Sequence, residues 1–478
     1  MAIEHLEHLV KPVEPTVLGS RSHFELTPLD LLIAHSVETI HVIPGELKIS
    51  LFNDALAQTL RVYPLAAGRL ERPITSESGP WKIRLTNSGV PVTFLESDAE
   101  EVMPNARVVQ NKGVASFVKA LDMKKVLATQ SDEPLARFTI TRFPRASSTI
   151  IGFSQYHPIG DGYTVANTLR LLSQLYQGLP SLDPSPCYDT PPLKPINPLT
   201  SIKYPLETMP TFMNDKPFPY GGTPHLMGRN KGNVSQIVLH LGASLIAELQ
   251  KAVNSRAKSN GQTAVLSKQD VLLALLARVF SISDPENPII YLISIFNYRG
   301  TSIIPPTAAC NSIISSISDP LQHDSFNGGF ESIESIALRS RQALQRIRDA
   351  DYFDAYRVKS TELMAYAAAK LLGQDFTPWD GQMTVNSTWK LDWTSPHFGY
   401  PGQTQFYHTI LPEPRFIKIF QPNPTCLSDG TWKTYAGDAE ITLSVLKDKR
   451  IAFEEAILGE LKEFGIEEKP EIIHSVLS

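Results

Sequence analysis

The segment Ser154–Tyr176, SQYHPIGDGYTVANTLRLLSQLY, predicts a corner at which a buried strand turns into a helix. The apolar run of residues 149–153 just before it is typical of a buried strand. After the corner, apolar residues recur with the spacing of an amphipathic helix, at Val165, Leu169, Leu172 and Tyr176. A proline and two glycines between the two elements allow a sharp turn. The pattern therefore places His157 at the C-terminal end of a strand, where a side chain can face a cleft.

His157 and Asp161 carry the chemistry of this corner. Imidazole is the usual proton carrier near neutral pH, so His157 is the candidate general base. Asp161 stands just before the helix, where a carboxylate caps free backbone N–H groups, so we favour a structural role for it. These two residues supply too few ligands for zinc, so no metal is expected, and the chain has no GxSxG elbow of a serine hydrolase. A base without a protein nucleophile suits a transfer reaction in which the substrate itself attacks.

The composition of the 478-residue chain excludes several classes of protein. Apolar residues make up 42% of the chain, which is enough for hydrophobic cores. The net charge of −5 implies no basic surface, so nucleic acid is not an expected partner. Three cysteines without CxxC spacing disfavour a disulfide scaffold, and no apolar run is long enough to predict a membrane span. The first ten residues lack the apolar core of a signal peptide, so we expect a cytoplasmic protein, and we expect a monomer.

Local patterns predict several further elements. Residues 47–63 repeat apolar side chains at helical spacing, and Pro64 ends that helix. Residues 81–85 and 90–94 alternate like the two strands of a hairpin. Because strand-like and helix-like patterns alternate along the chain, we predict an α/β (α+β) protein with mixed β-sheets flanked by helices.

A proline-rich stretch divides the chain into two parts. Residues 180–224 carry twelve prolines and little periodicity, which is typical of an extended linker. We therefore predict an N-terminal domain over residues 1–178, a linker over residues 179–232 and a C-terminal domain over residues 233–478.

Motifs along most of the chain resemble those of the BAHD acyl-CoA-dependent acyltransferases. The mark of that family, HxxxDG, is here His157-Pro-Ile-Gly-Asp161-Gly162. The most specific match is LKISLFNDALAQTLRVYPLAAGRL at residues 47–70, which resembles the family signature LkxSLsxtLxxfYPLAGRL. LSKQDVLLALLARV at residues 266–279 resembles the helix at the start of the second domain. Three shorter stretches resemble the arginine strand, the TSW stretch and the DFGWG motif: FNYRG (296–300), NSTW (386–389) and HFGYPG (397–402).

The resemblance implies two similar chloramphenicol-acetyltransferase-like domains with a channel between them. It also implies that a segment near residues 400–425 pairs with the N-terminal domain. His157 would act as the general base that helps a hydroxyl, or less readily an amine, of a small-molecule natural product to attack acyl-CoA. The reaction would pass through a ternary complex without a covalent acyl-enzyme. Acyl-CoA would be a cosubstrate, acetyl-CoA being the first candidate, and no cofactor would be bound.

The resemblance also assigns expected roles to other residues. The candidate donors to the oxyanion of the tetrahedral intermediate are Trp389 and Ser387. The structural residues at the site are Asp161, Gly162 and Arg299, with Arg299 expected to pair with Asp161. The candidate CoA-binding residues are Ser267, Lys268, Tyr400 and Gly402.

This chain departs from the family pattern at several positions. His397 replaces the aspartate of DFGWG, and Tyr400 replaces its tryptophan. In the arginine strand, Asn297 replaces the first aspartate and Thr301 the second arginine. These changes put the local salt bridges in doubt more than the chemistry, and divergence of this kind resembles fungal members of the family more than plant members.

Three alternatives stay open. A condensation or cyclisation enzyme of this fold would act on a carrier-protein thioester, but such condensation domains carry a second histidine where this chain has Tyr156. A hydrolase of the same fold would use water as the acceptor. A non-catalytic homologue would bind CoA or another ligand without releasing a thiol, although the intact His157 and Asp161 argue against it.

Overall fold

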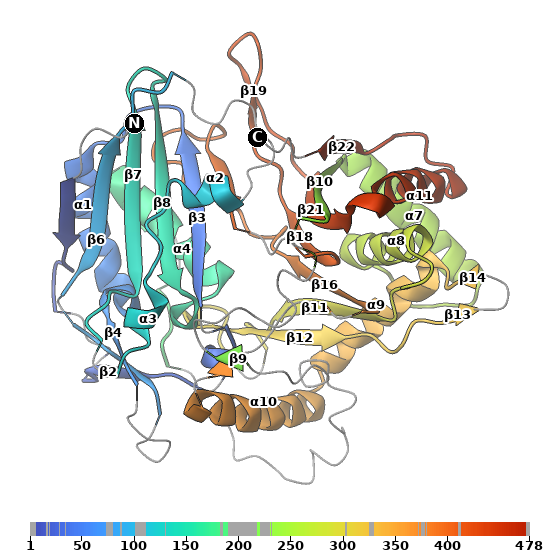
Figure 1. The fold of residues 1–478 in the computed structure, drawn as a ribbon, viewed down its shortest axis with the longest axis horizontal. Helices are drawn as coiled ribbons and strands as arrows, with labels where there is room; N and C mark the ends of the chain where they lie inside the picture. Colours follow the sequence, from blue (N-terminus) through green and yellow to red (C-terminus); the bar gives the residue numbers. More distant parts are fainter. Residues whose placement is uncertain are drawn as a thin grey trace.

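The computed structural model places the two halves of the chain side by side (Figure 1). Each half is built on a large mixed β-sheet with helices packed against it. The structure describes residues 6–474 except 16, 17, 19, 28, 34, 73–79, 87, 101–110, 130, 182–184, 190–217, 220–229, 231, 302, 303, 325–328, 371, 374–377, 379 and 410–412. Most of the predicted linker over residues 179–232 lies outside the described residues.

The first half contains a six-stranded sheet in the order β1-β6-β7-β8-β3-β17. Its strand β8 pairs antiparallel with both β7 and β3, and every residue of β8 is buried. The bounds of its strands are β1 Leu6–Val10, β3 Ser36–Ile43, β6 Val90–Glu96, β7 Ala136–Phe143, β8 Ser148–Tyr156 and β17 Gln405–His408. Because β8 lies inside the sheet, the corner that follows it starts from a rigid position.

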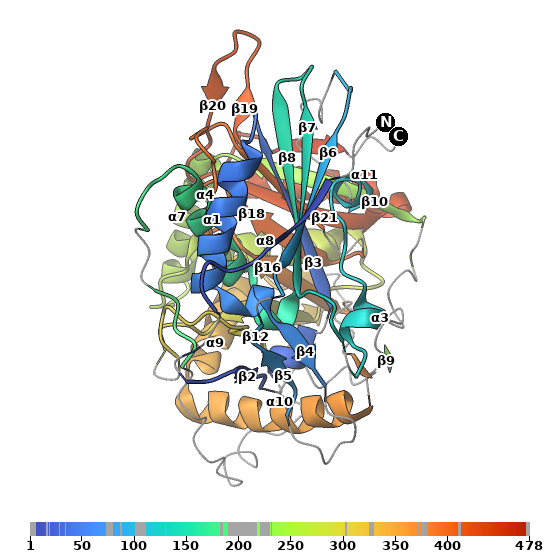
Figure 2. The same ribbon diagram turned by 90° about the vertical axis from the view of Figure 1, so that its left-hand side faces the viewer.

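Two helices pack together beside this sheet. They are α1, Ile49–Val62, and α4, Gly162–Tyr176, and Figure 2 shows α1 running alongside the strands. The predicted helix over residues 47–63 is thus confirmed as α1, and the 3-10 turn η2, Pro64–Ala67, follows it. The buried faces of both helices join one hydrophobic cluster with the strands, which fixes where α4 begins relative to β8.

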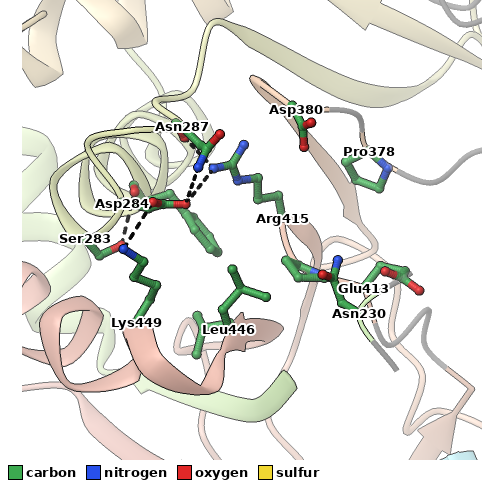
Figure 3. Close-up of a pocket in the computed structure, with 13 residues that line it drawn as sticks. Asn230, Ser283, Asp284, Asn287, Pro378, Asp380, Glu413, Arg415, Leu446 and Lys449 are labelled. Atoms are coloured by element: carbon green, nitrogen blue, oxygen red, sulfur yellow. Dashed lines mark hydrogen bonds and ion pairs between the residues drawn. The ribbon is translucent and has the colours of Figure 1, made fainter. Parts of the chain in front are cut away.

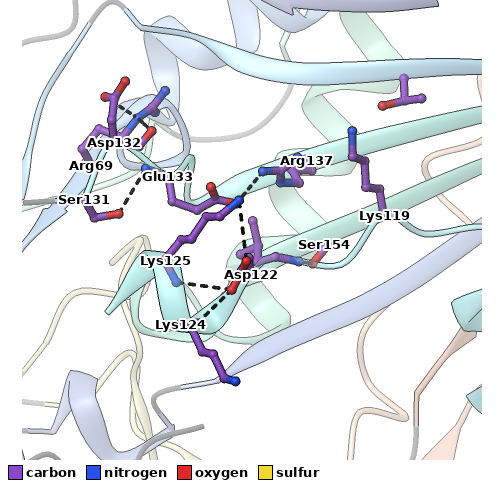
Figure 4. Close-up of polar contacts among 12 residues, drawn as sticks. Arg69, Lys119, Asp122, Lys124, Lys125, Ser131, Asp132, Glu133, Arg137 and Ser154 are labelled. Carbon is purple, nitrogen blue, oxygen red and sulfur yellow. Dashed lines mark hydrogen bonds and ion pairs between the residues drawn. The ribbon is translucent and has the colours of Figure 1, made fainter. Parts of the chain in front are cut away.

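Arg69, near the end of the 47–70 stretch, has a structural role. Arg69 is buried, and its guanidinium donates to the carbonyl oxygens of Gly68 at 2.9 Å and Asp132 at 2.8 Å. Figure 4 shows this side chain reaching the segment that leads into β7. In the same picture Arg137 of β7 pairs with Glu133. Arg69 therefore ties the strand after α1, β4 (Arg69–Glu71), to the central strands of the sheet.

One strand of the first sheet comes from the second half of the chain. β17 pairs antiparallel with β3, so that Phe406 lies opposite His41. The indole ring of Trp393 stacks on Phe406 with ring centroids 4.3 Å apart, and Trp393, Phe398 and Phe406 belong to the hydrophobic cluster of the first half. This exchange lies within the segment near residues 400–425 that the resemblance singled out, and it locks the two halves together.

The second half contains a seven-stranded sheet in the order β12-β11-β16-β18-β21-β10-β22. Helices cover the side of this sheet that faces away from the first half (Figure 1). The strands are β10 Val234–Leu241, β11 Tyr291–Asn297, β12 Ile313–Ile317, β16 Gln382–Ser387, β18 Phe416–Phe420, β21 Ala439–Leu446 and β22 Glu471–His474. The helices are α7 Ala243–Ser259, α8 Lys268–Ser283, α9 Ile333–Ile347 and α11 Arg450–Glu463.

The predicted hairpin over residues 81–94 is wrong. β5, Lys82–Arg84, pairs with β4 and with β2, His23–Glu25, in a small three-stranded sheet. β6 instead pairs with β1 and β7 in the large sheet. Alternation of apolar residues indicates a strand but does not say which strand lies next to it.

The remaining elements are short or lie at the margins. They are η1 Asp30–Ile33, α2 Asn111–Ala115, α3 Met123–Val126, η3 His157–Ile159, β9 Phe218–Pro219, β13 His323–Asp324, β14 Gly329–Phe330, α10 Ala350–Lys370, β15 Leu372–Gly373, β19 Thr425–Cys426, β20 Trp432–Lys433 and η5 Lys447–Lys449.

Candidate active site

His157 is the first residue after β8, at the predicted corner. It opens the 3-10 turn η3, and its backbone is held on both sides. The N–H of His157 donates to the carbonyl of His35 at 2.9 Å, and the carbonyl of His157 accepts from the N–H of Gly160 at 2.9 Å. Gly160 is required for this turn, because a Cβ there would lie 2.5 Å from the Thr164 methyl group. Two backbone hydrogen bonds and the lack of space for a side chain at Gly160 therefore hold the corner in this conformation.

The imidazole ring of His157 is buried and is not held by its neighbours. Its Nδ1 is buried and has no hydrogen-bond partner among the described residues. The ring of His35 packs edge-on against it with centroids 6.0 Å apart. Burial, followed by the charges of His35 and Lys418, lowers the pKa of His157 to about 3, against an opposing effect of Asp161. The ring is therefore neutral near pH 7, as a general base must be.

Asp161 does not serve as a partner of His157, because its two carboxylate oxygens are already occupied. Oδ1 caps helix α4 by accepting from the backbone N–H groups of Tyr163 at 3.1 Å and Thr164 at 3.3 Å. Oδ2 accepts from Nη1 of Arg299 at 2.7 Å and from the backbone N–H of Ser312 at 2.9 Å. Four hydrogen bonds hold this buried carboxylate, so the ion pair that the resemblance implied is present.

Arg299 connects the second half of the chain to the corner at His157. It is buried, and it follows β11. Its guanidinium also donates to the carbonyl oxygens of Ala308 at 2.7 Å and Cys310 at 2.5 Å. Gly162, which opens α4, lies against the second half as well, because a Cβ there would be 3.4 Å from the ring of Trp393. The corner that holds His157 is thus braced by residues from both halves.

The two candidate oxyanion donors are both engaged elsewhere. The single N–H of the Trp389 indole donates to the carbonyl of Asp438 at 2.7 Å. The hydroxyl of Ser387 donates to Oε1 of Gln269 at 2.9 Å. An indole has only one donor, so Trp389 could stabilise an oxyanion only after its bond to Asp438 broke. In this conformation the structure does not support either residue in that role.

The candidate CoA-binding residues come from two parts of the sequence, residues 267–268 and residues 400–402. Ser267 is the N-cap of α8, and it forms a capping box with Asp270, to which its hydroxyl donates at 2.7 Å. Lys268 is the first residue of α8 and is half-buried. Tyr400 instead lies against Gly45 of the first half, where an added Cβ would meet its hydroxyl. Gly402 occupies a turn with a positive φ of 71°. The hydroxyl of Ser267 is therefore used for helix capping.

The residues that differ from the family pattern form hydrogen bonds within their own loops and turns. Nδ1 of His397 accepts from the backbone N–H of Gly399 at 3.2 Å, within its own loop. The side-chain oxygen of Asn297 accepts from the backbone N–H of Arg299 at 3.0 Å. Thr301 donates to the carbonyl of Tyr298 at 2.7 Å. The changed residues thus cap turns, and His397 has no ion pair with an arginine of the described chain.

The sequence analysis missed two basic residues that act on His157, which are His35 and Lys418. It also missed His408, which lies beside Lys418. The sequence FIKIF around Lys418 is a strand pattern in which the lysine would face solvent in an ordinary surface sheet. A signal for its burial is absent from the sequence, because the partner half that covers this face is distant along the chain.

A separate cavity lies elsewhere in the second half. Its volume is about 110 Å³, and Figure 3 shows Asp284 at its wall between Arg415 and Lys449. The carboxylate of Asp284 lies 3.4 Å from Nη2 of Arg415 and 3.5 Å from Nζ of Lys449, so its charge is balanced within the protein. None of the predicted site residues lines this cavity.

Two features are absent from the part of the chain that the structure describes. No helix among them combines the length and the apolar character that a membrane crossing needs. No group of three or more histidine, cysteine, aspartate or glutamate side chains among them is placed to hold a metal ion.

Comparisons with known proteins give a family match and a set of similar structures. A family model described as "Transferase family" matches residues 4–400, and no curated protein matches the chain. Vinorine synthase is similar in structure, with a TM-score of 0.63, 16% identity and coverage of 96% of this chain and 98% of that chain. TRI101 of F. graminearum, solved with coenzyme A and deoxynivalenol, has a TM-score of 0.63, 14% identity and coverage of 94% and 99%. TRI101 of F. sporotrichioides, solved with coenzyme A and T-2, has a TM-score of 0.62, 13% identity and coverage of 94% and 99%. At these identities the structures show that the fold is shared.

Proposed function

Because this chain belongs to the Transferase family, the BAHD acyltransferases, we propose that it transfers an acyl group from acyl-CoA to a hydroxyl group of a small-molecule natural product. The observation that carries this proposal is the state of His157, a buried and neutral imidazole that no neighbouring side chain holds. Its aspartate is fully occupied by the scaffold, so the ring alone is available to move a proton.

The proton and the acyl group move in a balanced sequence. Nε2 of His157 accepts the proton of the substrate hydroxyl while the oxygen attacks the thioester carbonyl. The tetrahedral intermediate then expels the CoA thiolate, which takes the proton back from the imidazolium and leaves as the free thiol. Because the low pKa of His157 makes it a weak base, proton removal must be concerted with attack. No acyl-enzyme and no cofactor take part in this mechanism.

Arg299 and Asp161 act on this reaction only through the backbone. Asp161 fixes the start of α4, and Arg299 holds Asp161, so together they set the direction in which β8 delivers His157. Both residues are positioning residues in this proposal, and Gly162 lies beside them against Trp393.

The solved relatives support a small-molecule acceptor. The two TRI101 structures were obtained with coenzyme A together with T-2 or deoxynivalenol, which are small molecules. Acetyl-CoA is the first donor to test, and we propose that the enzyme works as a cytoplasmic monomer.

Release of free CoA thiol tests the proposal. We expect release from one or more acyl-CoA thioesters only when an alcohol acceptor is added, and loss of that release in His157→Ala with an unchanged melting temperature. Near wild-type turnover in a folded His157→Ala protein would refute the role of the base. Release without an acceptor would identify a hydrolase, and binding of CoA without release would identify a binding protein.

A further inference from the structure

Strand β18 presents a charged side chain toward the other half of the protein. Ile417 and Ile419 point into the hydrophobic cluster of the second half and are fully buried there. Side chains alternate along a strand, so Phe416, Lys418 and Phe420 lie on the opposite face. Phe420 packs against the cluster of the first half, and its ring lies 4.4 Å from that of His408 in β17. Lys418 therefore lies between the two halves.

The ammonium group of Lys418 has neighbours but no counter-ion. Nζ lies 3.1 Å from Nδ1 of His408 and 3.2 Å from the carbonyl oxygen of Thr409. Among the residues that the structure describes, no carboxylate forms an ion pair with it. Burial lowers the pKa of Lys418 to about 7, and no negative charge opposes that shift. An ammonium group in this position is costly unless an anion joins it.

Hydrogen bonds connect this cation to the strand that begins beside the reaction centre. Thr409, whose carbonyl accepts from Lys418, donates its backbone N–H to the carbonyl of Glu38 in β3 at 3.2 Å. His35, just before β3, packs against the ring of His157, and the charge of Lys418 contributes to the lowered pKa of both histidines. Lys418 also keeps some accessible surface. A group bound at Lys418 would thus lie between the two halves, on the side of the start of β3.

The ammonium group of Lys418 has N–H groups without an acceptor. Nδ1 of His408 donates to the carbonyl of Thr409, so this neutral imidazole carries its proton on Nδ1, and Nζ of Lys418 contacts that nitrogen without donating to it. Nε2 of His408 is buried and has no partner among the described residues. The acceptor that remains for the lysine is the carbonyl of Thr409, so two of its three N–H groups are free.

We propose that Lys418, with His408 beside it, binds a carboxylate carried by one of the two substrates, so that the enzyme selects an anionic acyl donor or an anionic acceptor. This inference rests on the proposed acyl transfer. A carboxylate would supply the missing counter-ion and the missing acceptors in one group, through charge-assisted hydrogen bonds. It would bind without touching the reacting atoms, which makes Lys418 a specificity-determining residue.

The experiment measures kcat/KM for acyl transfer in two arms. The donor arm compares malonyl-CoA with acetyl-CoA, and the acceptor arm compares hydroxy acids with their methyl esters. We expect the acid to be preferred in one arm by about 10- to 100-fold, as a hydrogen bond to a charged group allows. In Lys418→Met this preference should fall to about twofold or less, with little change for the neutral substrate. Lys418→Arg should keep most of it, and Lys462→Met, an exposed lysine on α11, is the matched control.

Each outcome decides between the two proposals. Absence of a preference for acids in both arms of the wild type refutes the inference, whether or not Lys418→Met folds. An equal loss with acids and neutral substrates in a folded Lys418→Met protein also refutes it, while the proposed acyl transfer stands. If the wild type transfers nothing from any donor to any acceptor, the proposed function fails and the inference fails with it.

Discussion

Two corners of this protein join a strand to a helix, and both bring a histidine and an aspartate together. In the first half, β8 turns into α4, with His157 and Asp161 four positions apart. In the second half, β10 turns into α7, where His240 meets Asp438 from a loop 198 positions further along the chain. In both corners the aspartate accepts backbone N–H groups at the start of the helix.

The difference lies in what the aspartate does for the histidine. Asp438 binds Nε2 of His240 at 2.8 Å with Oδ2 and the N–H of Ala243 at 2.8 Å with Oδ1, and its carbonyl holds Trp389. Asp161 is turned to Arg299, which leaves the ring of His157 without such a bond. His240 is tied to its carboxylate at a corner of the fold, whereas the neutral ring of His157 lacks such a bond. The proposed function places the chemistry at His157, and we expect a structural task for His240.

The largest expected effect separates the two histidines by activity. His157→Ala should lower kcat for acyl transfer by about 10²–10⁴-fold, because it removes the general base. His240→Ala should lower it by less than about tenfold, since a structural contact is lost rather than a reacting group. Steady-state thiol release with each purified variant checks this. Similar losses in both variants would break the distinction between the corners.

The next effect concerns the buried ion pair of the first corner. Asp161→Asn keeps a capping oxygen but leaves Arg299 as an unpaired buried cation, which should cost about 3–5 kcal/mol of unfolding free energy. Urea denaturation followed by fluorescence measures the loss. The conservative control is Asp122→Asn, which alters the exposed cap of α3 and should cost far less. An Asp161→Asn protein with wild-type stability but no activity would show that Asp161 has a chemical role instead.

A smaller effect is expected at the second corner. Asp438→Ala removes the partner of His240 and the acceptor for the first N–H of α7, which should cost about 1–3 kcal/mol. The backbone carbonyl that holds Trp389 remains, so the position of that indole should change little. Chemical denaturation gives the cost, and indole fluorescence reports on the environment of Trp389. A loss as large as that of Asp161→Asn would mean that the two corners are equally important for the fold.

The fourth expected effect is a difference in pH dependence, which develops only as the pH falls. Burial, and after it His35, lowers the pKa of His157 to about 3, whereas a histidine in an unfolded chain titrates near ~6.5. Between these values the unfolded chain binds a proton that the folded chain does not. The contribution of His157 to stability is therefore complete above the unfolded pKa and is lost as the pH falls toward the folded one.

Melting temperatures measured across this range check the sign. Tm should fall more steeply with decreasing pH in the wild type than in His157→Ala, because the variant lacks this linked proton. Parallel curves would show that His157 titrates normally in the folded protein, and the case for a neutral buried base would then be lost.

Much of the local structure could be predicted from the sequence. The corner at His157, the helix α1 and the Ser267 cap of α8 follow from spacing and capping residues that are neighbours along the chain. The partners of some strands did not follow, as the placement of β5 and β6 in different sheets shows. The sequence also did not predict that Trp389 donates to Asp438 and Ser387 to Gln269, because these acceptors are distant along the chain.

By itself the sequence determined where a strand ends, where a helix begins, and that a histidine stands between them, because those features depend on contacts within a few residues. Only the tertiary structure decided that Asp438 holds His240, that Ser387 donates to Gln269, and that Lys418 lies between the two halves. The physical reason is that hydrogen bonds and burial at these groups come from segments more than a hundred residues away, or from a neighbouring strand whose outer face the other half covers.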